Sequence, residues 1–151
     1  MRAAMLACLI GGVTAAAQTP AVSPHLKQLE GHWKPESVQF DGKEQLDAKA
    51  KQALTLWIKD AEYRMFYVSD PAKDLHFRLF TADLALDPAT KTFALTVKDG
   101  QKKGEKRHGI YEVKGDKLTV CYGPAEKPRP TTFATTAGSE CFCEVWVKEK
   151  K

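Results

Sequence analysis

Apolar and polar residues alternate along most of the chain after Gly31, and a period of two predicts β-strands. In the segment TFALTVK, for example, Phe93, Leu95 and Val97 fall on one face, with small or polar residues between them. The clearest alternating segments are 76–80, 92–98, 117–122 and 141–148. Long helical periodicity is nearly absent, so the pattern indicates an all-β domain.

Turn signals separate these segments at short intervals and predict hairpins. They are Asp41-Gly42, Asp70-Pro71, Asp87-Pro88, Asp99-Gly100 and Gly115-Asp116. Successive hairpins build a single antiparallel meander, and closing it into a small β-barrel of about eight strands removes the two exposed sheet edges. A sandwich of two sheets is the alternative. Residues 43–53 are rich in strong helix formers and predict one short helix or a polar loop.

The apolar faces of the predicted strands define the barrel interior, which a barrel of this size fills with side chains or shares with one small ligand. The residues expected to line it are Leu56, Phe77, Leu79, Phe93, Leu95, Val97, Tyr111, Leu118 and Val120. These faces bring few charges inward, and Tyr111 and Tyr122 are the hydroxyl donors expected there. Any ligand is therefore expected to be small and largely apolar.

The N-terminal residues have the layout of a cleavable signal peptide. Arg2 precedes an apolar run over residues 3–13, and small residues follow up to Ala17. Cleavage near Ala17 would export the chain to the periplasm, the envelope or the medium. An uncleaved anchor and lipidation of Cys8 are the alternatives.

Removal of a signal peptide, residues 1–17, would leave a short linker, 18–25, and one barrel domain, 26–151. The formal net charge of +4 would then fall to +3, with 22 Lys and Arg against 19 Asp and Glu. The basic residues gather at turns and at the tail without stacking aromatics, so no nucleic-acid partner is expected. No segment after the signal peptide is long and apolar enough to span a membrane.

Three cysteines follow the signal peptide, and an odd number cannot all pair within one chain. Cys121 falls on the polar face of its predicted strand, whereas Cys141 and Cys143 fall on the apolar face of theirs. Export favours oxidation, but a one-residue bulge is needed to bring these faces together. A disulfide from Cys121 to Cys141 or Cys143 and three free thiols are therefore both open.

The sequence shows no catalytic or metal-binding constellation. A metal held by Cys141 and Cys143 would need further ligands, and the four histidines lack paired ligand spacing. The serines lack the context of a nucleophile elbow, Asp83 and Asp87 flank a predicted turn, and His108 is expected at the surface. No catalytic residue, metal or cofactor is therefore predicted.

The segment GIYEVKGDKLTVCYGPAEKPRPTTFAT, residues 109–135, resembles the signature of an uncharacterised domain family described chiefly from planctomycete bacteria. The opening LEGHWKPESVQFDGK and the central DPATKTFALTV are similar to the same family, so the likeness runs over about residues 26–148. The resemblance implies a lipocalin-like barrel and no established activity. Cys141 and Cys143 depart from the residues usual in the family's last strand.

In lipocalins, a Gly-x-Trp motif on the first strand closes one end of the barrel, often with an arginine stacked on the indole. Gly31 and Trp33 match this motif, and Arg129 is the candidate cation. A cation over an indole stabilises a fold by about 1 kcal/mol. The resemblance therefore implies that these residues form a structural anchor, and it argues against a ligand contact at Trp33.

Three hypotheses for the function follow. The leading one is an exported lipocalin-like binding protein whose ligand is small and largely apolar. The second is a structural or protein-interaction module of the envelope, with a packed barrel, no ligand and an unknown protein partner. The third, an enzyme with a site at the barrel mouth, has no catalytic residues to support it.

Overall fold

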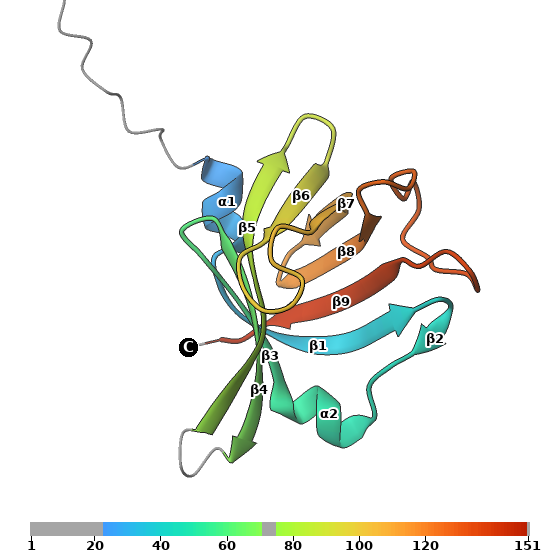
Figure 1. Ribbon diagram of the computed structural model, residues 1–151. Coiled ribbons are helices and arrows are strands. Elements are labelled where there is room, and N and C mark those ends of the chain that lie inside the picture. The colour runs from blue at the N-terminus through green and yellow to red at the C-terminus, as the bar shows by residue number, and fades with distance from the viewer. Residues whose placement is uncertain (1–22, 71–74, 151) are drawn as a thin grey trace, which may run out of the picture.

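The computed structural model describes residues 23–70 and 75–150, and in that part of the chain it shows two short helices and nine strands. In chain order the elements are α1 (Pro24–Leu29), β1 (Gly31–Phe40), β2 (Lys43–Glu44), α2 (Ala48–Ala53), β3 (Leu54–Lys59), β4 (Glu62–Asp70), β5 (Leu75–Asp87), β6 (Thr92–Val97), β7 (Lys106–Lys114), β8 (Lys117–Pro124) and β9 (Phe142–Lys148). Figure 1 shows the strands lying side by side in chain order, with α1 and α2 at the periphery. The predicted signal peptide, residues 1–17, lies outside the described residues.

Strands β1 and β3 to β9 form a closed, eight-stranded antiparallel barrel. Each strand of the ring pairs with the next along the chain, and β1 also pairs with β9, from Trp33 opposite Lys148 to Phe40 opposite Phe142. Strand β2 pairs only with the end of β1, outside the ring. The predicted meander and lipocalin-like barrel are confirmed. The sandwich alternative is wrong, because the pairing of β1 with β9 leaves no break between two sheets.

Side chains from the inner faces of the strands fill the closed half of the barrel. Trp33, Leu56 and Trp146 have no exposed surface. The residues expected to line the interior that are buried here are Leu56, Phe93, Leu95, Val97, Tyr111, Leu118 and Val120. The space left among the side chains at this end is about 10 Å³, which is room for one water molecule at most. These residues therefore form a packed core and do not surround a ligand cavity.

Helix α1 covers the closed end of the barrel. Its buried residues, Leu26 and Leu29, pack on the core, and Trp33 Nε1 donates a hydrogen bond to the backbone oxygen of Leu29 at 2.9 Å. Pro24 begins the helix, where a missing N–H is tolerated. Pro24 and His25, from the predicted linker 18–25, thus belong to the fold, because even a helix of six residues can bury two leucines against the barrel end that it covers.

Strands β4 and β5 extend beyond the ring. Strand β6 pairs with β5 only from Ala82 onward, since the turn at Asp99-Gly100 ends β6. Residues 75–80 of β5 therefore pair with β4 alone, and β4 pairs with β5 alone beyond Tyr67, its last residue that pairs with β3. We call the projecting hairpin of residues 66–70 and 75–80 the arm. Phe77 and Leu79 lie on the arm and are 61% and 57% exposed. The prediction that these two residues line the barrel interior is wrong for Phe77, and Leu79 lies at the mouth.

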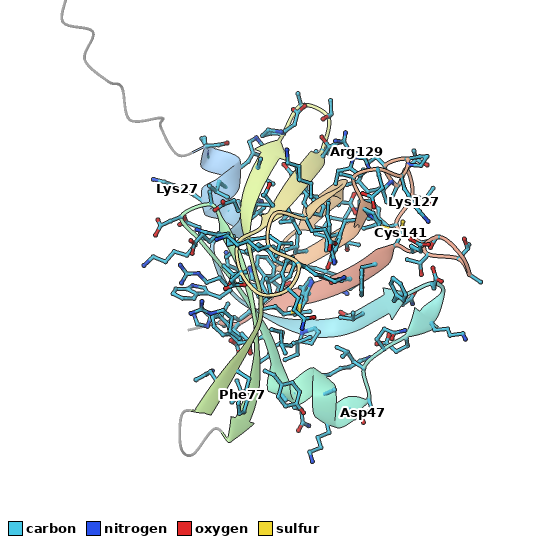
Figure 2. The ribbon with its side chains drawn as sticks, in the orientation of Figure 1. Lys27, Asp47, Phe77, Lys127, Arg129 and Cys141 are labelled. Atoms are coloured by element: carbon cyan, nitrogen blue, oxygen red, sulfur yellow. The ribbon has the colours of Figure 1, made fainter. Side chains whose placement is uncertain are left out.

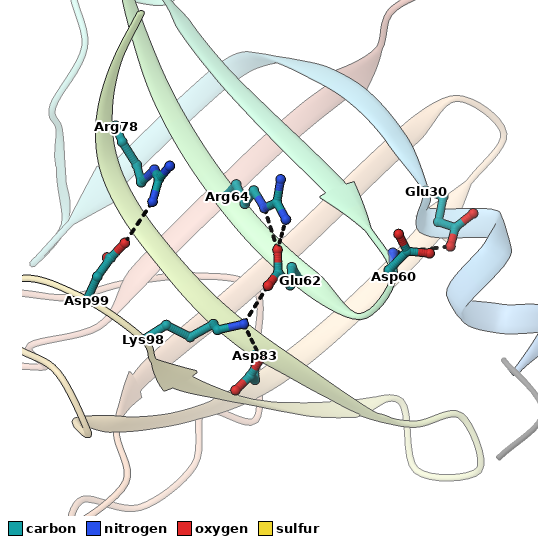
Figure 3. Close-up of polar contacts among 8 residues, drawn as sticks. All are labelled: Glu30, Asp60, Glu62, Arg64, Arg78, Asp83, Lys98 and Asp99. Atoms are coloured by element: carbon teal, nitrogen blue, oxygen red, sulfur yellow. Dashed lines mark hydrogen bonds and ion pairs between the residues drawn. The ribbon is translucent and has the colours of Figure 1, made fainter. Parts of the chain in front are cut away.

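Charged side chains join the outer faces of the strands where the arm separates from the ring. Lys98 bridges Glu62 of β4 and Asp83 of β5, and Arg64 also pairs with Glu62 (Figure 3). Exposed ion pairs of this kind contribute about 0 to 1 kcal/mol each. They help to hold the strands in register and supply no chemistry of their own.

Candidate functional site

The open end of the barrel holds a pocket of about 280 Å³. Its wall is built by the arm on one side and by α2 on the other, and Figure 2 shows Phe77 and Asp47 at this end of the molecule. The Asp47 side chain caps α2 by accepting a hydrogen bond from the Ala50 backbone N–H at 2.7 Å. The lining residues are Val38, Leu46, Ala50, Leu54, Met65, Tyr67, Leu79, Phe80, Arg107, Tyr122, Phe142 and Glu144.

A buried carboxyl group lies at the floor of this pocket. Glu144 of β9 is only 1% exposed. Its Oε1 accepts a hydrogen bond from the Tyr122 hydroxyl at 2.7 Å. Its Oε2 accepts from the Tyr63 hydroxyl and from Trp146 Nε1, each at 2.8 Å. Three donors thus replace the water that the carboxyl group loses on burial, which is the condition for keeping such a group inside a barrel.

The same burial changes the acidity of the floor. Burial raises the pKa of Glu144, while the hydrogen bonds from Tyr122, Tyr63 and Trp146 and the charge of Arg107 act in the opposite direction. Burial, followed by the charge of Glu144, raises the pKa of Tyr63 and Tyr122 well above the ordinary tyrosine value. Both phenols therefore stay protonated and act as fixed donors at the pocket floor.

Arg107 of β7 brings a cation to the pocket wall. Its guanidinium carbon lies 5.5 Å from the ring centre of Phe80, 5.8 Å from that of Tyr122 and 5.6 Å from that of Phe142. Its Nε donates to Glu105 at 2.8 Å. A guanidinium has five N–H donors, and the hydrogen bond to Glu105 uses one of them. The aromatic rings hold the side chain in place while donors remain for a bound molecule.

A second pocket, of about 270 Å³, adjoins the first at Arg107 and Phe142, which line both. Its other lining residues are Phe40, Lys102, Glu105, Gly123, Pro124 and Glu140. Four of the eight residues that line this second pocket are charged, against two of the twelve that line the first. The mouth of the barrel therefore offers an apolar pocket and a second pocket with more charged groups, and the two meet at Arg107 and Phe142.

The sequence predicted few of these residues. Of the nine expected lining residues, Leu79 alone belongs to the mouth pocket. Arg107 and Glu144 were missed. The prediction placed Cys143 on the apolar, inward face of the last strand, and this is wrong, since Phe142, Glu144 and Trp146 point inward. The aromatic rings of Phe142 and Trp146 bury more apolar surface than Val145 and Val147 would. Tyr122 of the neighbouring strand β8 and Tyr63 of β4 also hydrogen-bond to the carboxyl group.

The predicted anchor lies at the opposite, closed end. Trp33 is fully buried, and the cation over its ring is Lys148, whose Nζ lies 5.2 Å from the ring centre and donates to the Gln28 backbone oxygen at 3.0 Å. The expectation for Arg129 is wrong, because this residue lies in the long connection between β8 and β9 (Figure 2). Gly31 has a φ of 136°, and a Cβ there would meet Lys148 Cε at 2.9 Å.

The cysteines lie together on the outer face of the barrel. Cys121 of β8 is directly opposite Cys143 of β9. The prediction that these two residues occupy different faces is therefore wrong, and the cause is the reversed face of β9. Cys121, Cys141 and Cys143 are free thiols in the structure.

Within residues 23–70 and 75–150, no group of three or more His, Cys, Asp and Glu side chains is arranged to hold a metal ion. His108 is half-buried, and its Nε2 lies 2.8 Å from the Lys127 backbone oxygen. No helix in this part of the chain is both long and apolar enough to cross a membrane.

Comparison with known proteins adds little to this picture. No family model matches the chain, and no curated protein sequence matches it. Among solved structures, the chain is similar to a single-residue mutant of the fluorescent protein UnaG, with 12% sequence identity and a TM-score of 0.42. The alignment covers 83% of this chain and 99% of that chain. The assignment of a lipocalin-like barrel rests on the chain's own strand pairing.

Proposed function

We propose that the protein is an exported binding protein that takes a small, largely apolar molecule in the pocket at the barrel mouth. The observation that carries this proposal is a pocket of about 280 Å³ whose walls are apolar and whose polar groups are few and fixed. A site with these properties is typical of small-molecule recognition. A benzene-sized molecule fits an apolar cavity of about 150 Å³, so this pocket has room for a somewhat larger one.

The position of the polar groups suggests how the ligand would lie. Its apolar body would contact Val38, Leu54 and Met65, which lie deep in the barrel mouth. A group that accepts hydrogen bonds would face Arg107, because the guanidinium has donors beyond the one that Glu105 uses. A longer molecule would pass Arg107 into the second pocket.

Packing of the closed half supports the mouth over the centre of the barrel as the site. A ligand at the centre would have to displace side chains that leave about 10 Å³ between them. Displacing well-packed core residues costs several kcal/mol. Export remains part of the proposal and rests on the signal-peptide pattern of residues 1–17.

The test is native mass spectrometry of protein purified from its own host, followed by thermal-shift measurements across a panel of lipids and metabolites. The proposal predicts a co-purifying small molecule and a rise in melting temperature with that molecule or a relative of it. No bound molecule in repeated preparations, together with no thermal shift across the panel, would contradict it.

The exposed arm favours a second candidate, a protein-interaction module. Phe77 and Leu79 are exposed large apolar residues on a strand segment that pairs on one side only. An open strand edge with apolar side chains is a common surface for pairing with another chain. Phe77→Ser would abolish capture of a partner if this function holds. It would leave ligand binding at the mouth intact if the first function holds, because Phe77 does not line the mouth pocket.

A further inference from the structure

Strands β8 and β9 place two cysteines face to face. Cys121 and Cys143 are register partners, so their side chains lie side by side on the outer face of the barrel. Residues directly opposite in antiparallel strands have Cα atoms about 4.5 to 5.5 Å apart. Disulfides span Cα separations of about 4.4 to 6.8 Å. The backbone therefore already holds these two residues at a distance that a disulfide bridges.

The connection between β8 and β9, residues 125–141, covers this pair, and we call it the strap. Beneath it Cys121 has no exposed surface and Cys143 is 6% exposed. The Cys121 thiol lies 3.8 Å from the Ala134 backbone oxygen, to which it donates. The Lys127–Glu140 ion pair, at 2.8 Å, links the two ends of the strap. The pair is thus shielded from large reagents and reached by small ones when the strap opens locally.

Cys141 differs from the other two cysteines. It lies at the end of the strap and is partly exposed, and its thiol donates to the Ser139 backbone oxygen at 3.3 Å. A Cβ added to Gly123 would lie 2.9 Å from its sulfur, so Cys141 packs over a glycine of β8 instead of a second thiol. Residues two apart on one strand are separated by about 6.6 Å, with parallel side chains, which disfavours a bond between Cys141 and Cys143.

We propose that Cys121 and Cys143 are a redox pair that forms a disulfide across β8 and β9, with Cys141 left as the free thiol. This goes beyond ligand binding and does not rest on it. Of the two pairings left open by the sequence, the register selects Cys143, because the reversed face of β9 makes a bulge unnecessary.

The oxidant in this step is a small-molecule disulfide such as oxidised glutathione. The Cys143 thiolate attacks one sulfur of that disulfide, which forms a mixed disulfide and releases one glutathione thiolate. Cys121 then loses its proton and attacks the Cys143 sulfur, which forms the intramolecular bond and releases the second glutathione thiolate. The protons from the two cysteines end on the two released thiols. The neighbouring Cys121 thiol lowers the pKa of Cys143, which favours Cys143 as the attacking group.

The bond would tie together the two strands that carry part of the mouth pocket. Tyr122 and Phe142, whose rings stack at 5.5 Å, are the neighbours of the two cysteines and line the pocket on the other face of the same strands. Closing the loop that contains the strap restricts the unfolded chain. Oxidation should therefore raise the melting temperature, by roughly 5 to 12 °C for a domain of this size.

The experiment uses the full chain, first reduced and then equilibrated with a mixture of oxidised and reduced glutathione. Remaining thiols are blocked with N-ethylmaleimide, and the protein is cleaved after glutamate. Glu126 and Glu140 lie between Cys121 and the other two cysteines, so a linked pair of peptides reports the bond. The expected result is one linked pair with the maleimide on Cys141, located by fragment ions.

Matched variants make the assignment independent of the fragment ions. Cys141→Ser should keep both the linked peptides and the rise in melting temperature on oxidation, whereas Cys143→Ser should lose both. If Cys143→Ser fails to fold, the wild-type peptide map still decides the question. The proposal is overturned by a Cys121–Cys141 linkage, or by glutathione on Cys141 while Cys121 and Cys143 still react with maleimide after unfolding.

Discussion

Trp33→Ala is the sharpest test of the anchor at the closed end. The indole has no exposed surface, its N–H donates to the Leu29 oxygen, and Lys148 lies over the ring. Truncating a buried tryptophan to alanine costs about 3 to 5 kcal/mol. The Leu29 oxygen also loses its partner, and an unsatisfied buried acceptor costs about 1 to 3 kcal/mol where water does not reach it. A loss near 4 kcal/mol is a large share of the stability of an ordinary domain.

Urea unfolding followed by circular dichroism measures this loss directly. Trp33→Phe is the matched control, because it keeps an aromatic ring and removes the N–H donor; it should cost less than the alanine variant. The mouth pocket is lined by other residues, so Trp33→Ala protein that still folds should bind a ligand normally. A free energy of unfolding within about 1 kcal/mol of wild type would show that the indole does not anchor the closed end, since cavity formation alone should cost more than that. A Trp33→Ala protein that is stable but no longer binds a ligand would show that the ligand site lies at the closed end of the barrel and not at the mouth.

Three further predictions concern other parts of the barrel. Gly109→Ala should lower the free energy of unfolding in urea by about 3 kcal/mol or more, because a Cβ there would lie 2.2 Å from a backbone oxygen of β8. Gly115→Ala is the control: it lies in open space at a φ of 61° and should cost only about 1 to 2 kcal/mol. Equal losses for the two variants would contradict the close packing at Gly109. The free energy of unfolding should fall as pH rises above about 10, because the pKa values of Tyr63 and Tyr122 are raised in the folded protein and the unfolded chain releases these protons first. Tyr63→Phe should make this fall less steep. An unchanged slope would show that burial does not raise the pKa of Tyr63. Asp47→Ala should speed hydrogen exchange in α2 by removing its cap, at a cost of about 1 kcal/mol, whereas exchange as slow as in wild type would show that packing alone holds the helix.

The strand pattern could be read from the sequence wherever one face of a strand is clearly apolar. Residues 92–97 and 117–122 satisfy this condition, and their inner faces were predicted correctly. Strand β9 does not, because Val145 and Val147 compete with Phe142 and Trp146 for the inner face. The tight turn at Asp60 and Ala61 was missed as well. Both residues have positive φ, of 51° and 60°, without the glycine that usually signals such a turn.

The mouth pocket lay beyond sequence reasoning for a different reason. Arg107 and Glu144 stand on β7 and β9, far apart in the chain, and barrel closure brings them to one end. A lone glutamate between apolar neighbours gives no sign that it will be buried with two tyrosines. Its spacing from Trp146, two residues away on the same face, was the available signal. An arginine beside a predicted turn is ordinarily a solvent-exposed residue.

The most direct test of the central claim is a binding titration with the fluorescent probe anilinonaphthalene sulfonate, which combines an apolar body with one anionic group. Ala50→Phe places a large ring into the mouth pocket from α2, whereas Ala48→Phe adds the same ring at an exposed position of that helix. Binding in the mouth pocket predicts saturable binding of one probe to the wild type and to Ala48→Phe, and affinity weaker by tenfold or more for Ala50→Phe. Equal affinity for all three proteins would show that the mouth pocket is not the binding site.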